Sequence, residues 1–562
     1  MKTVLATINA KYIHTSLALR WLYVANKDRF DISFKEFTLK DTLDNIVSSI
    51  LDSNCDIVGL GVYIWNVKQT KQLVCRLRQA KPQLIIILGG PEVTYEPDFF
   101  ITNWDIDYVI SGEGEFVLGE LIYALENKLS DQLAGVSSKS KISNEVVQAD
   151  MQQLARLESP YTLDEDKEDL KNRLIYFETS RGCPYQCQYC LSSLEKGVRY
   201  FDRDYIFSNL KQLIDNRVRQ LKFLDRTFNL NREHTLAVFD FLLEHHRENL
   251  VCQFEIYADL LHPDIIEYIN TQLPKDFFRF EIGIQSTYEP TNVAVKRKQN
   301  FELLADNVRK LILGGKIDFH LDLIAGLPYE TFPRFSKSFN DVFVLRAKEV
   351  QLGFLKMLRG TALRKGADAY GYVYDTEAPY EIRSNDSISE QELDRIHGVE
   401  HALEKYWNSG RFKRTMNRLC DEQYAGRYFE LFDEIGQYYT KHKLPHMGYQ
   451  LEDLFRTLDS FLNTKGIDLF DELRFDYYAN FSQRPTGFWK QDEDRKSLKK
   501  ILYGIGQDKD FLEENNLTRK IIEKQTAIYS MGTERYELVV FLPTTTGCLR
   551  KALYYTENKD IN

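Results

Sequence analysis

Residues 180–190 read Ser180-Arg181-Gly182-Cys183-Pro184-Tyr185-Gln186-Cys187-Gln188-Tyr189-Cys190. Three cysteines therefore stand in a C-x3-C-x2-C spacing, directly after Leu174–Thr179, whose composition predicts a strand. Three thiolates on one tight loop can hold three corners of an iron–sulfur cube, because soft thiolate ligands suit such clusters. Ordinary electron-transfer clusters take four cysteines. A set of three leaves one iron open to a substrate or cofactor.

Zinc and unrelated core cysteines are the alternative interpretations of this cluster. A structural zinc site needs four ligands, usually in two separated pairs, and the sequence contains no second C-x2-C. A four-cysteine cluster would need a distant ligand such as Cys252. The other five of the eight cysteines are scattered singly, so we expect no disulfide scaffold.

The cysteine loop opens a region, residues 172–375, in which apolar strands alternate with helical patterns. Six such units predict an open partial barrel, with the cysteine loop at the carboxyl end of its first strand, where barrel chemistry is found. The predicted strands are Leu174–Thr179, Gln220–Leu224, Cys252–Ile256, Phe278–Ile284, Asp318–Ile324 and Val350–Met357.

The region before it, residues 1–130, also alternates strands and helices, which predicts a doubly wound parallel sheet. Its predicted strands are Thr3–Ile8, Ile32–Phe37, Ile57–Val62, Leu84–Leu88 and Tyr108–Ile110. Glycine-containing loops follow three of them, at Gly59–Asn66, Leu88–Glu92 and Gly112–Glu115. Glycine lets a ligand approach the backbone, and the next helix offers free N–H groups, so we expect a nucleotide-like pocket. Tight turns in a flavodoxin-like sheet are the plainer interpretation.

The cysteine loop resembles that of the radical S-adenosylmethionine superfamily. The spacing matches in full, and Tyr189 is the aromatic residue that members place before the third cysteine. The resemblance implies that Cys183, Cys187 and Cys190 bind a 4Fe–4S cluster. Its open iron would chelate the amino and carboxylate groups of S-adenosylmethionine, and one electron would cleave this cofactor to methionine and a 5′-deoxyadenosyl radical.

Three later segments resemble other parts of this superfamily. Leu224–Asn229 looks like the D-x-x-F loop of the cobalamin-dependent branch, which replaces Gly-Gly-Glu, and it implies an amino-group partner. Glu281–Ser286 resembles the fourth-strand segment near ribose and methionine, and Leu323–Glu330 resembles the G-L-P-x-E turn near adenine. An ordinary strand and turn would explain each segment alone. The cofactor-binding residues that the resemblance implies are Tyr189, Asp225, Glu281, Gln285 and Gly326.

The N-terminal loops look like those of the cobalamin-binding domain of cobalamin-dependent members. The elements Y-x-W-N, G-G-P and G-E-G-E all match. One departure concerns the axial histidine, which many such domains supply from D-x-H-x-x-G, whereas Tyr12–Leu17 has His14 without the acidic residue or the glycine. The corrinoid-binding residues that the resemblance implies are Tyr63, Trp65, Gly89, Gly90, Gly112, Glu113 and Gly114.

Composition and the remaining segments complete the predicted organisation. Residues 131–171 are polar and read as a linker with one short hairpin. Residues 376–562 read as a mostly helical domain without a chemical motif, ending in a strand pair Tyr536–Leu542 and Lys551–Tyr555. The net charge of −10 argues against nucleic acid as a partner. No apolar stretch is long enough to span a membrane. The first residues lack a signal-peptide pattern, so we expect a cytoplasmic protein.

The predicted function is that of a cobalamin-dependent radical S-adenosylmethionine enzyme, in which methylcobalamin could donate a methyl group to an unactivated carbon of an unknown substrate. The electron would come from a donor such as flavodoxin or ferredoxin. Radical rearrangement or cyclisation with cobalamin as an electron partner is also open, because the sequence shows no substrate-reading residues. Two alternatives come from other classes of protein. One is a methylthiotransferase-like enzyme, although the N-terminal domain has only Cys55 and Cys75 for a second cluster. The other is a non-catalytic sensor that binds a cluster or corrinoid.

Overall fold

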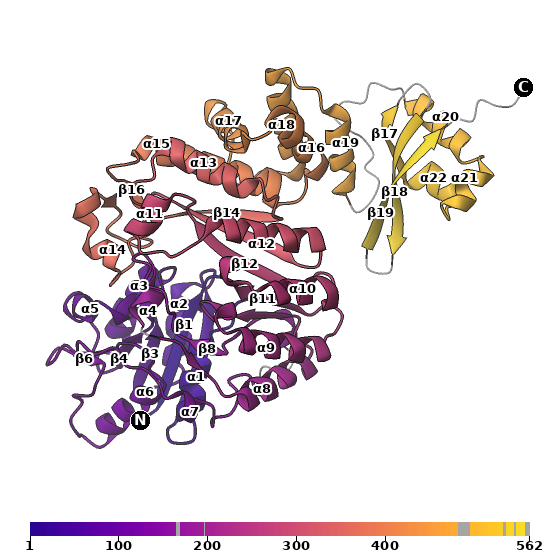
Figure 1. Ribbon diagram of the computed structural model, residues 1–562. Coiled ribbons are helices and arrows are strands. Elements are labelled where there is room, and N and C mark those ends of the chain that lie inside the picture. The colour runs from indigo at the N-terminus through magenta and orange to yellow at the C-terminus, as the bar shows by residue number, and fades with distance from the viewer. Residues whose placement is uncertain (164–168, 196, 482–494, 532–534, 545–546, 557–562) are drawn as a thin grey trace, which may run out of the picture. The chain divides into compact units, whose positions relative to one another are not determined.

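A computed structural model describes residues 1–163, 169–195, 197–481, 495–531, 535–544 and 547–556 (Figure 1). The chain divides into two compact units. The first comprises Met1–Ala347 and Gln351–Leu393, and the second comprises Lys348–Val350 and Asp394–Asn562. The sequence placed this boundary after residue 375. No helix within the described residues has both the length and the apolar character needed to cross a bilayer.

The N-terminal part of the first unit is a six-stranded sheet in the order β2-β1-β3-β4-β5-β6, the arrangement of a doubly wound fold. Its strands are β1 (Thr3–Asn9), β2 (Ile32–Thr38), β3 (Ile57–Gly61), β4 (Ile85–Gly89), β5 (Tyr108–Ile110) and β6 (Val136–Ser138). Its helices are α1 (Leu17–Asn26), α2 (Leu43–Leu51), α3 (Val67–Ala80), α4 (Pro91–Thr94), α5 (Pro97–Asn103) and α6 (Glu115–Glu126). The strands β1 to β5 run parallel. β1, β3, β4 and β5 are largely buried, as their apolar composition predicts, whereas the edge strand β2 is mostly half-buried.

The predicted linker contributes to this sheet. Within residues 131–171, β6 pairs antiparallel with β5, and the short helix α7 spans Met151–Leu154. Val136 is buried in the core of the sheet although its neighbours in the sequence are polar. A three-residue edge strand with one apolar side chain gives no alternating pattern, which explains why the sequence indicated a short hairpin here but not its pairing with β5. Residues 164–168 of the linker lie outside the described ranges.

The rest of the first unit is the predicted open barrel, a six-stranded sheet in the order β14-β13-β12-β11-β10-β7. Its strands are β7 (Leu174–Phe177), β10 (Gln220–Phe223), β11 (Val251–Glu255), β12 (Phe278–Gln285), β13 (Asp318–Ala325) and β14 (Glu349–Phe354). The helices between them are α8 (Arg203–Asp215), α9 (Arg232–Glu244), α10 (Pro263–Gln272), α11 (Glu289–Ala294), α12 (Phe301–Gly314) and α13 (Phe332–Phe343). Because β7 and β14 are both edge strands, the barrel is open between them.

Alternation along the barrel strands separates two faces. In β12 the side chains Phe278, Phe280, Ile282 and Ile284 are fully buried, while the intervening ones, such as Glu281, are partly exposed. Phe239 on α9 packs against Phe278, which shows that the apolar face packs on the helices. The polar face therefore lines the interior of the barrel.

The second unit is helical with a small sheet at its end. The helices are α15 (Glu390–Leu403, which begins in the first unit), α16 (Lys413–Arg418), α17 (Tyr428–Lys441), α18 (Leu451–Lys465), α19 (Phe470–Ala479), α20 (Arg495–Ile505), α21 (Lys509–Glu514) and α22 (Arg519–Gln525). The predicted strand pair is a three-stranded antiparallel sheet of β17 (Thr526–Met531), β18 (Arg535–Thr544) and β19 (Gly547–Thr556). β17 follows α22 without a turn, so no break in the sequence marks where it begins.

Candidate iron–sulfur and cofactor site

The cysteine loop leaves the barrel at the carboxyl end of β7 and is closed at its base by a short antiparallel pair. This pair consists of β8 (Ser180–Arg181) and β9 (Arg199–Tyr200). Gly182 has a φ of +90°, and a Cβ there would lie 2.2 Å from the carbonyl oxygen of Gly197. Only glycine allows the two backbones to approach so closely. The cysteines are thus held on a loop whose two ends are fixed.

Two backbone hydrogen bonds fix the middle of the loop. The Gln188 N–H donates to the Val295 carbonyl oxygen at 2.9 Å, and the Leu363 N–H donates to the Gln188 carbonyl oxygen at 3.0 Å. Next to them, Arg297 donates to the Tyr189 hydroxyl at 3.3 Å. Tyr189, predicted to contact a cofactor, therefore also ties the loop to the segment after α11.

The three thiols are close enough to interact electrostatically. Burial raises the pKa of the Cys183 thiol, and negative charge on the other two cysteines raises it further. Burial also raises the pKa of Cys187, which is only 6% exposed. Among the described residues, no three ligand side chains converge on a single metal ion. In a 4Fe–4S cube each thiolate binds a different iron, so three thiols of one loop can hold such a cluster without converging on a single ion.

Asp225, predicted as an amino-group partner, lies beneath the loop and is 2% exposed. Its carboxylate accepts hydrogen bonds from the Thr179 N–H at 3.0 Å, the Thr179 hydroxyl at 2.6 Å and the Ser180 hydroxyl at 2.5 Å. Burial raises its pKa to about 6, against the effect of these donors. Through these hydrogen bonds Asp225 fixes the segment after β7 from which the cysteine loop begins.

We expect Asp225→Asn to lower the free energy of unfolding by about 2 kcal/mol, because the amide group would face donors that the carboxylate now satisfies. Urea denaturation would measure this loss. The control is Asp215→Asn, since Asp215 is exposed and its replacement should leave stability unchanged. An Asp225→Asn variant as stable as the wild type would contradict this role for the carboxylate.

Charged side chains inside the barrel surround the predicted residue Glu281. Its carboxylate accepts from the Lys222 ammonium at 2.7 Å and from the Gln253 amide. Gln285, at the end of the same strand, has a φ of +69° and a buried side-chain oxygen without a hydrogen-bond partner within the described structure. Gly326 packs against Ile382, and its carbonyl oxygen accepts from the Tyr372 hydroxyl at 2.9 Å. Glu281 thus belongs to a network inside the protein, whereas Gln285 retains a free acceptor.

The unit also contains an arginine, Arg226, next to Asp225 in the sequence. Arg226 is exposed to solvent, although many protein atoms lie around its side chain. These surroundings lower the pKa of the guanidinium, but the Glu255 carboxylate and the Cys190 thiol raise it above its ordinary value. Within the described residues its side chain forms no hydrogen bond or ion pair. An unpaired guanidinium beside a predicted cluster ligand is suited to an anionic group. The resemblance named Asp225 for this loop and overlooked Arg226.

The predicted corrinoid loops of the N-terminal domain differ in how open they are. Tyr63 and Trp65 stack with ring centroids 4.5 Å apart, and Trp65 is 45% exposed. Gly89 has no atom nearer than 3.9 Å to a Cβ position, whereas a Cβ on Gly90, at a φ of +106°, would lie 2.6 Å from the Val62 carbonyl oxygen. The aromatic pair and Gly89 can therefore face a ligand, while Gly90 is required by the turn.

His14 lies at the junction of the two sheets. Its Nδ1 is 2.8 Å from the Tyr176 hydroxyl, and its backbone bridges to Leu174 at the start of β7. Burial and the nearby cations Lys11, Lys222 and Arg173 lower its pKa, so the imidazole is neutral near pH 7. No carboxylate is hydrogen-bonded to this ring in the described residues.

The G-E-G-E loop after β5 contacts the cysteine loop instead of solvent. Glu113 forms ion pairs with Arg181 and Arg199, and Glu115 forms one with Arg181 at 2.8 Å. Gly112 has a φ of +101°, and a Cβ there would lie 2.2 Å from the Val147 carbonyl oxygen. Gly114 has no such restriction. The loop is therefore built mainly around contacts within the protein.

We expect Gly112→Ala to destabilise the protein by about 2 kcal/mol, because alanine at this φ is strained and its Cβ meets backbone. Gly114→Ala in the same loop is the matched control, since its nearest atoms are side-chain carbons at 3.4 Å. Thermal unfolding of the two variants would separate them. Equal stabilities would show that the contact with Val147 does not restrict residue 112.

A second interdomain contact lies at the other edge of the barrel. Arg359, which follows β14, is 6% exposed and lies 3.1 Å from the Glu92 carboxylate of α4; it also pairs with Glu96. The N-terminal domain therefore contacts the segments that follow both edge strands of the open barrel, at Arg181 after β7 and at Arg359 after β14. Nothing in the sequence marks these arginines, because a buried ion pair leaves no periodic pattern. For Arg181, the one signal was its place two residues before Cys183.

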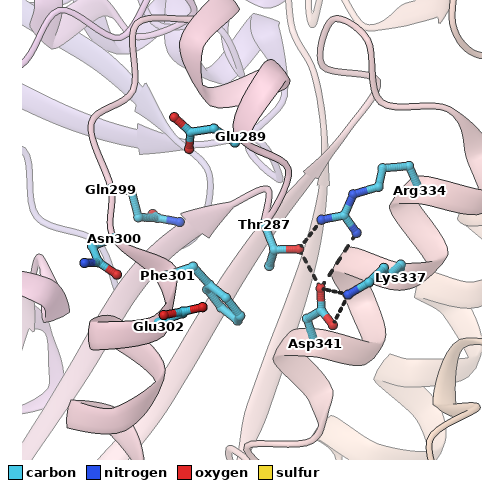
Figure 2. A pocket seen from close by; sticks show the side chains of 9 residues that line it. All are labelled: Thr287, Glu289, Gln299, Asn300, Phe301, Glu302, Arg334, Lys337 and Asp341. Carbon is cyan, nitrogen blue, oxygen red and sulfur yellow. Dashed lines mark hydrogen bonds and ion pairs between the residues drawn. The ribbon is translucent and has the colours of Figure 1, made fainter.

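A surface pocket of about 600 Å³ lies among α11, α12 and α13 (Figure 2). In it, the Thr287 hydroxyl accepts from Arg334 at 2.8 Å and donates to Asp341 at 2.8 Å, as Figure 2 shows. Neither a cysteine nor any of the predicted cofactor-binding residues lines this pocket. It is separate from the candidate site.

Family comparisons agree with this architecture. Residues 3–122 match the B12 binding domain, residues 177–342 match the radical SAM superfamily, and residues 368–539 match a protein family of unknown function, DUF4080. The chain thus carries a B12-binding domain followed by a radical SAM domain. These matches confirm the predicted domain types and the predicted cofactors: cobalamin, S-adenosylmethionine and a 4Fe–4S cluster.

Individual relatives point to the same branch. The cobalamin-dependent radical SAM methyltransferase TokK of Streptomyces tokunonensis is 28% identical over 313 residues, which are 51% of this chain and 44% of TokK. The chain thus spans less than half the length of this relative. Two solved structures share the fold. The radical S-adenosylmethionine methyltransferase TsrM from Kitasatospora setae has a TM-score of 0.56 at 16% identity, and the match covers 67% of this chain and 79% of TsrM. The cobalamin-dependent S-adenosylmethionine radical enzyme OxsB has a TM-score of 0.58 at 16% identity, and the match covers 86% of this chain and 81% of OxsB.

Proposed function

We propose that this chain is a cobalamin-dependent radical S-adenosylmethionine enzyme that methylates an unactivated carbon of a small molecule. The observation that carries the proposal is the cysteine loop, which presents three thiols at the carboxyl end of the first barrel strand. The G-E-G-E loop of the B12-binding domain lies against it. Relatives named as methyltransferases support the reaction type.

The side chains have separate tasks in this proposal. Cys183, Cys187 and Cys190 would hold the cluster, and Tyr63, Trp65 and Gly89 would contact the corrin. When bound, the cluster and S-adenosylmethionine supply a 5′-deoxyadenosyl radical, and cobalamin supplies a methyl group. The chain itself holds the cysteine loop through Asp225. The ion pairs of Arg181 and Arg359 hold the N-terminal domain against the barrel, so the reaction would take place between the two domains.

Arg226 and Gln285 would bind the polar groups of S-adenosylmethionine or of the substrate. Arg226 offers an unpaired guanidinium for a carboxylate, and Gln285 offers an unpaired amide oxygen for a hydroxyl or amino group. Flavodoxin or ferredoxin would supply the electron. The cytoplasmic location stays a prediction.

Anaerobic reconstitution of the full chain with iron, sulfide and hydroxocobalamin tests the proposal. With dithionite and S-adenosylmethionine, we expect 5′-deoxyadenosine above the level of an iron-free control, measured by mass spectrometry. A protein that binds both the cluster and cobalamin but forms no 5′-deoxyadenosine would support the sensor alternative. Failure to bind cobalamin would remove the corrinoid half of the proposal.

A further inference from the structure

The base of the cysteine loop contains two arginines that face each other. In the β8–β9 pair, Arg181 is the direct cross-strand partner of Arg199. Like charges directly opposite one another destabilise a strand pair. This pair has only two residues in each strand, so it has few backbone hydrogen bonds to offset the repulsion. The base of the loop therefore needs a negative partner.

A single carboxylate from the N-terminal domain provides that partner. Glu113 lies 3.0 Å from the Arg181 guanidinium, and Arg199 donates to both of its oxygens. The same carboxylate accepts from the Ala149 N–H at 2.8 Å. Glu113 is 15% exposed and Arg181 10%, so these charges interact in a medium of low dielectric constant, where pairing is strong.

The two arginines depend on Glu113 to different degrees. Arg181 also pairs with Glu115 and Glu178, whereas Glu113 is the one carboxylate that Arg199 contacts among the described residues. Moving Glu113 would thus leave Arg199 unpaired opposite Arg181 and would open the base of the loop. Arg199 therefore depends on this one carboxylate for its ion pair among the described residues.

Glu113 belongs to the loop at the carboxyl end of β5, the edge at which doubly wound sheets bind their ligands. We propose that Glu113 couples the two cofactor sites: a corrinoid that orders the G-E-G-E loop also fixes the cysteine loop, and a bound cluster tightens corrinoid binding. The inference rests on the proposed function. Because coupling between two binding sites is reciprocal, it can be measured from either side.

The test compares hydroxocobalamin binding to the full chain with and without a reconstituted cluster. Absorbance titration should give a Kd about tenfold lower for the cluster-loaded wild type, within the usual range for coupled sites. In Arg199→Gln the two Kd values should agree within about twofold. Arg203→Gln is the matched control, because Arg203 is on the surface and Glu233, which is exposed, is its one ion-pair partner in the described part of the chain. This variant should keep the tenfold difference.

A second measurement follows the cluster. Hydroxocobalamin should slow the release of iron to a chelator in the wild type and in Arg203→Gln, but not in Arg199→Gln. Equal Kd values in the wild type, with and without the cluster, would overturn the coupling and leave the proposed function intact. Retained coupling in Arg199→Gln would show that Glu113 does not carry it. If the wild type bound no hydroxocobalamin at all, the corrinoid part of the proposed function would fail, and the coupling with it.

Discussion

Replacing Cys187 with alanine is expected to abolish the formation of 5′-deoxyadenosine. Cys187 is the most buried of the three loop cysteines. Without its thiolate, two of the four irons would have no protein ligand, instead of one. We therefore expect the iron bound after reconstitution to fall from about four atoms per chain to near zero. Iron analysis, electron paramagnetic resonance and product detection would each report the loss.

Cys75→Ala is the matched control for this experiment. Cys75 is exposed on α3, far from the loop in the sequence, and its replacement removes a thiol of the same intrinsic chemistry. Its iron content and product formation should equal those of the wild type. If Cys187→Ala kept a full cluster, another ligand would have to hold it, and the three-thiol site would be wrong.

The sequence was sufficient for the parts of the fold that depend on composition and period. The strands that later form β3 and β4 are continuous apolar runs, and such runs are typical of parallel strands buried on both faces. The cysteine spacing predicts an iron–sulfur site because few other arrangements use three thiols within eight residues. Both signals are local, so they could be read without knowing what lies nearby in space.

Contacts between distant segments could not be predicted in the same way. Glu113 stands in a glycine-rich loop, and the sequence is the same whether its carboxylate meets a ligand or Arg181, 68 residues away. Asp225 is a similar case, because a D-x-x-F pattern does not tell which of Asp225 and Arg226 faces the interior. In both cases the tertiary packing decides which neighbour each side chain meets.

Arg359→Met is expected to lower the free energy of unfolding by about 4 kcal/mol, because it leaves the Glu92 carboxylate buried without its cation. Glu92 is only 4% exposed. Among the described residues, the Tyr380 hydroxyl is the one other group that donates a hydrogen bond to its carboxylate. Urea denaturation would measure the loss. The control is Arg383→Met, since Arg383 is 57% exposed and pairs with Asp375 on the surface, where an ion pair contributes little.

The pH dependence of this loss distinguishes a buried charge from lost packing. Burial already raises the pKa of Glu92, and Arg359 lowers it, so the variant should have a still higher pKa in the folded state. A carboxyl whose pKa is raised on folding stabilises the protein when protonated, and that stabilisation is lost as the pH rises through the shifted pKa. The deficit of Arg359→Met should therefore be larger at about pH 8 than at about pH 5. Adding Glu92→Gln should restore part of it at the higher pH, because the double variant no longer buries the Glu92 charge. A deficit that is equal at both pH values and unchanged by Glu92→Gln would assign the cost to the contact of the guanidinium with the Phe99 ring, 4.0 Å away, rather than to its charge.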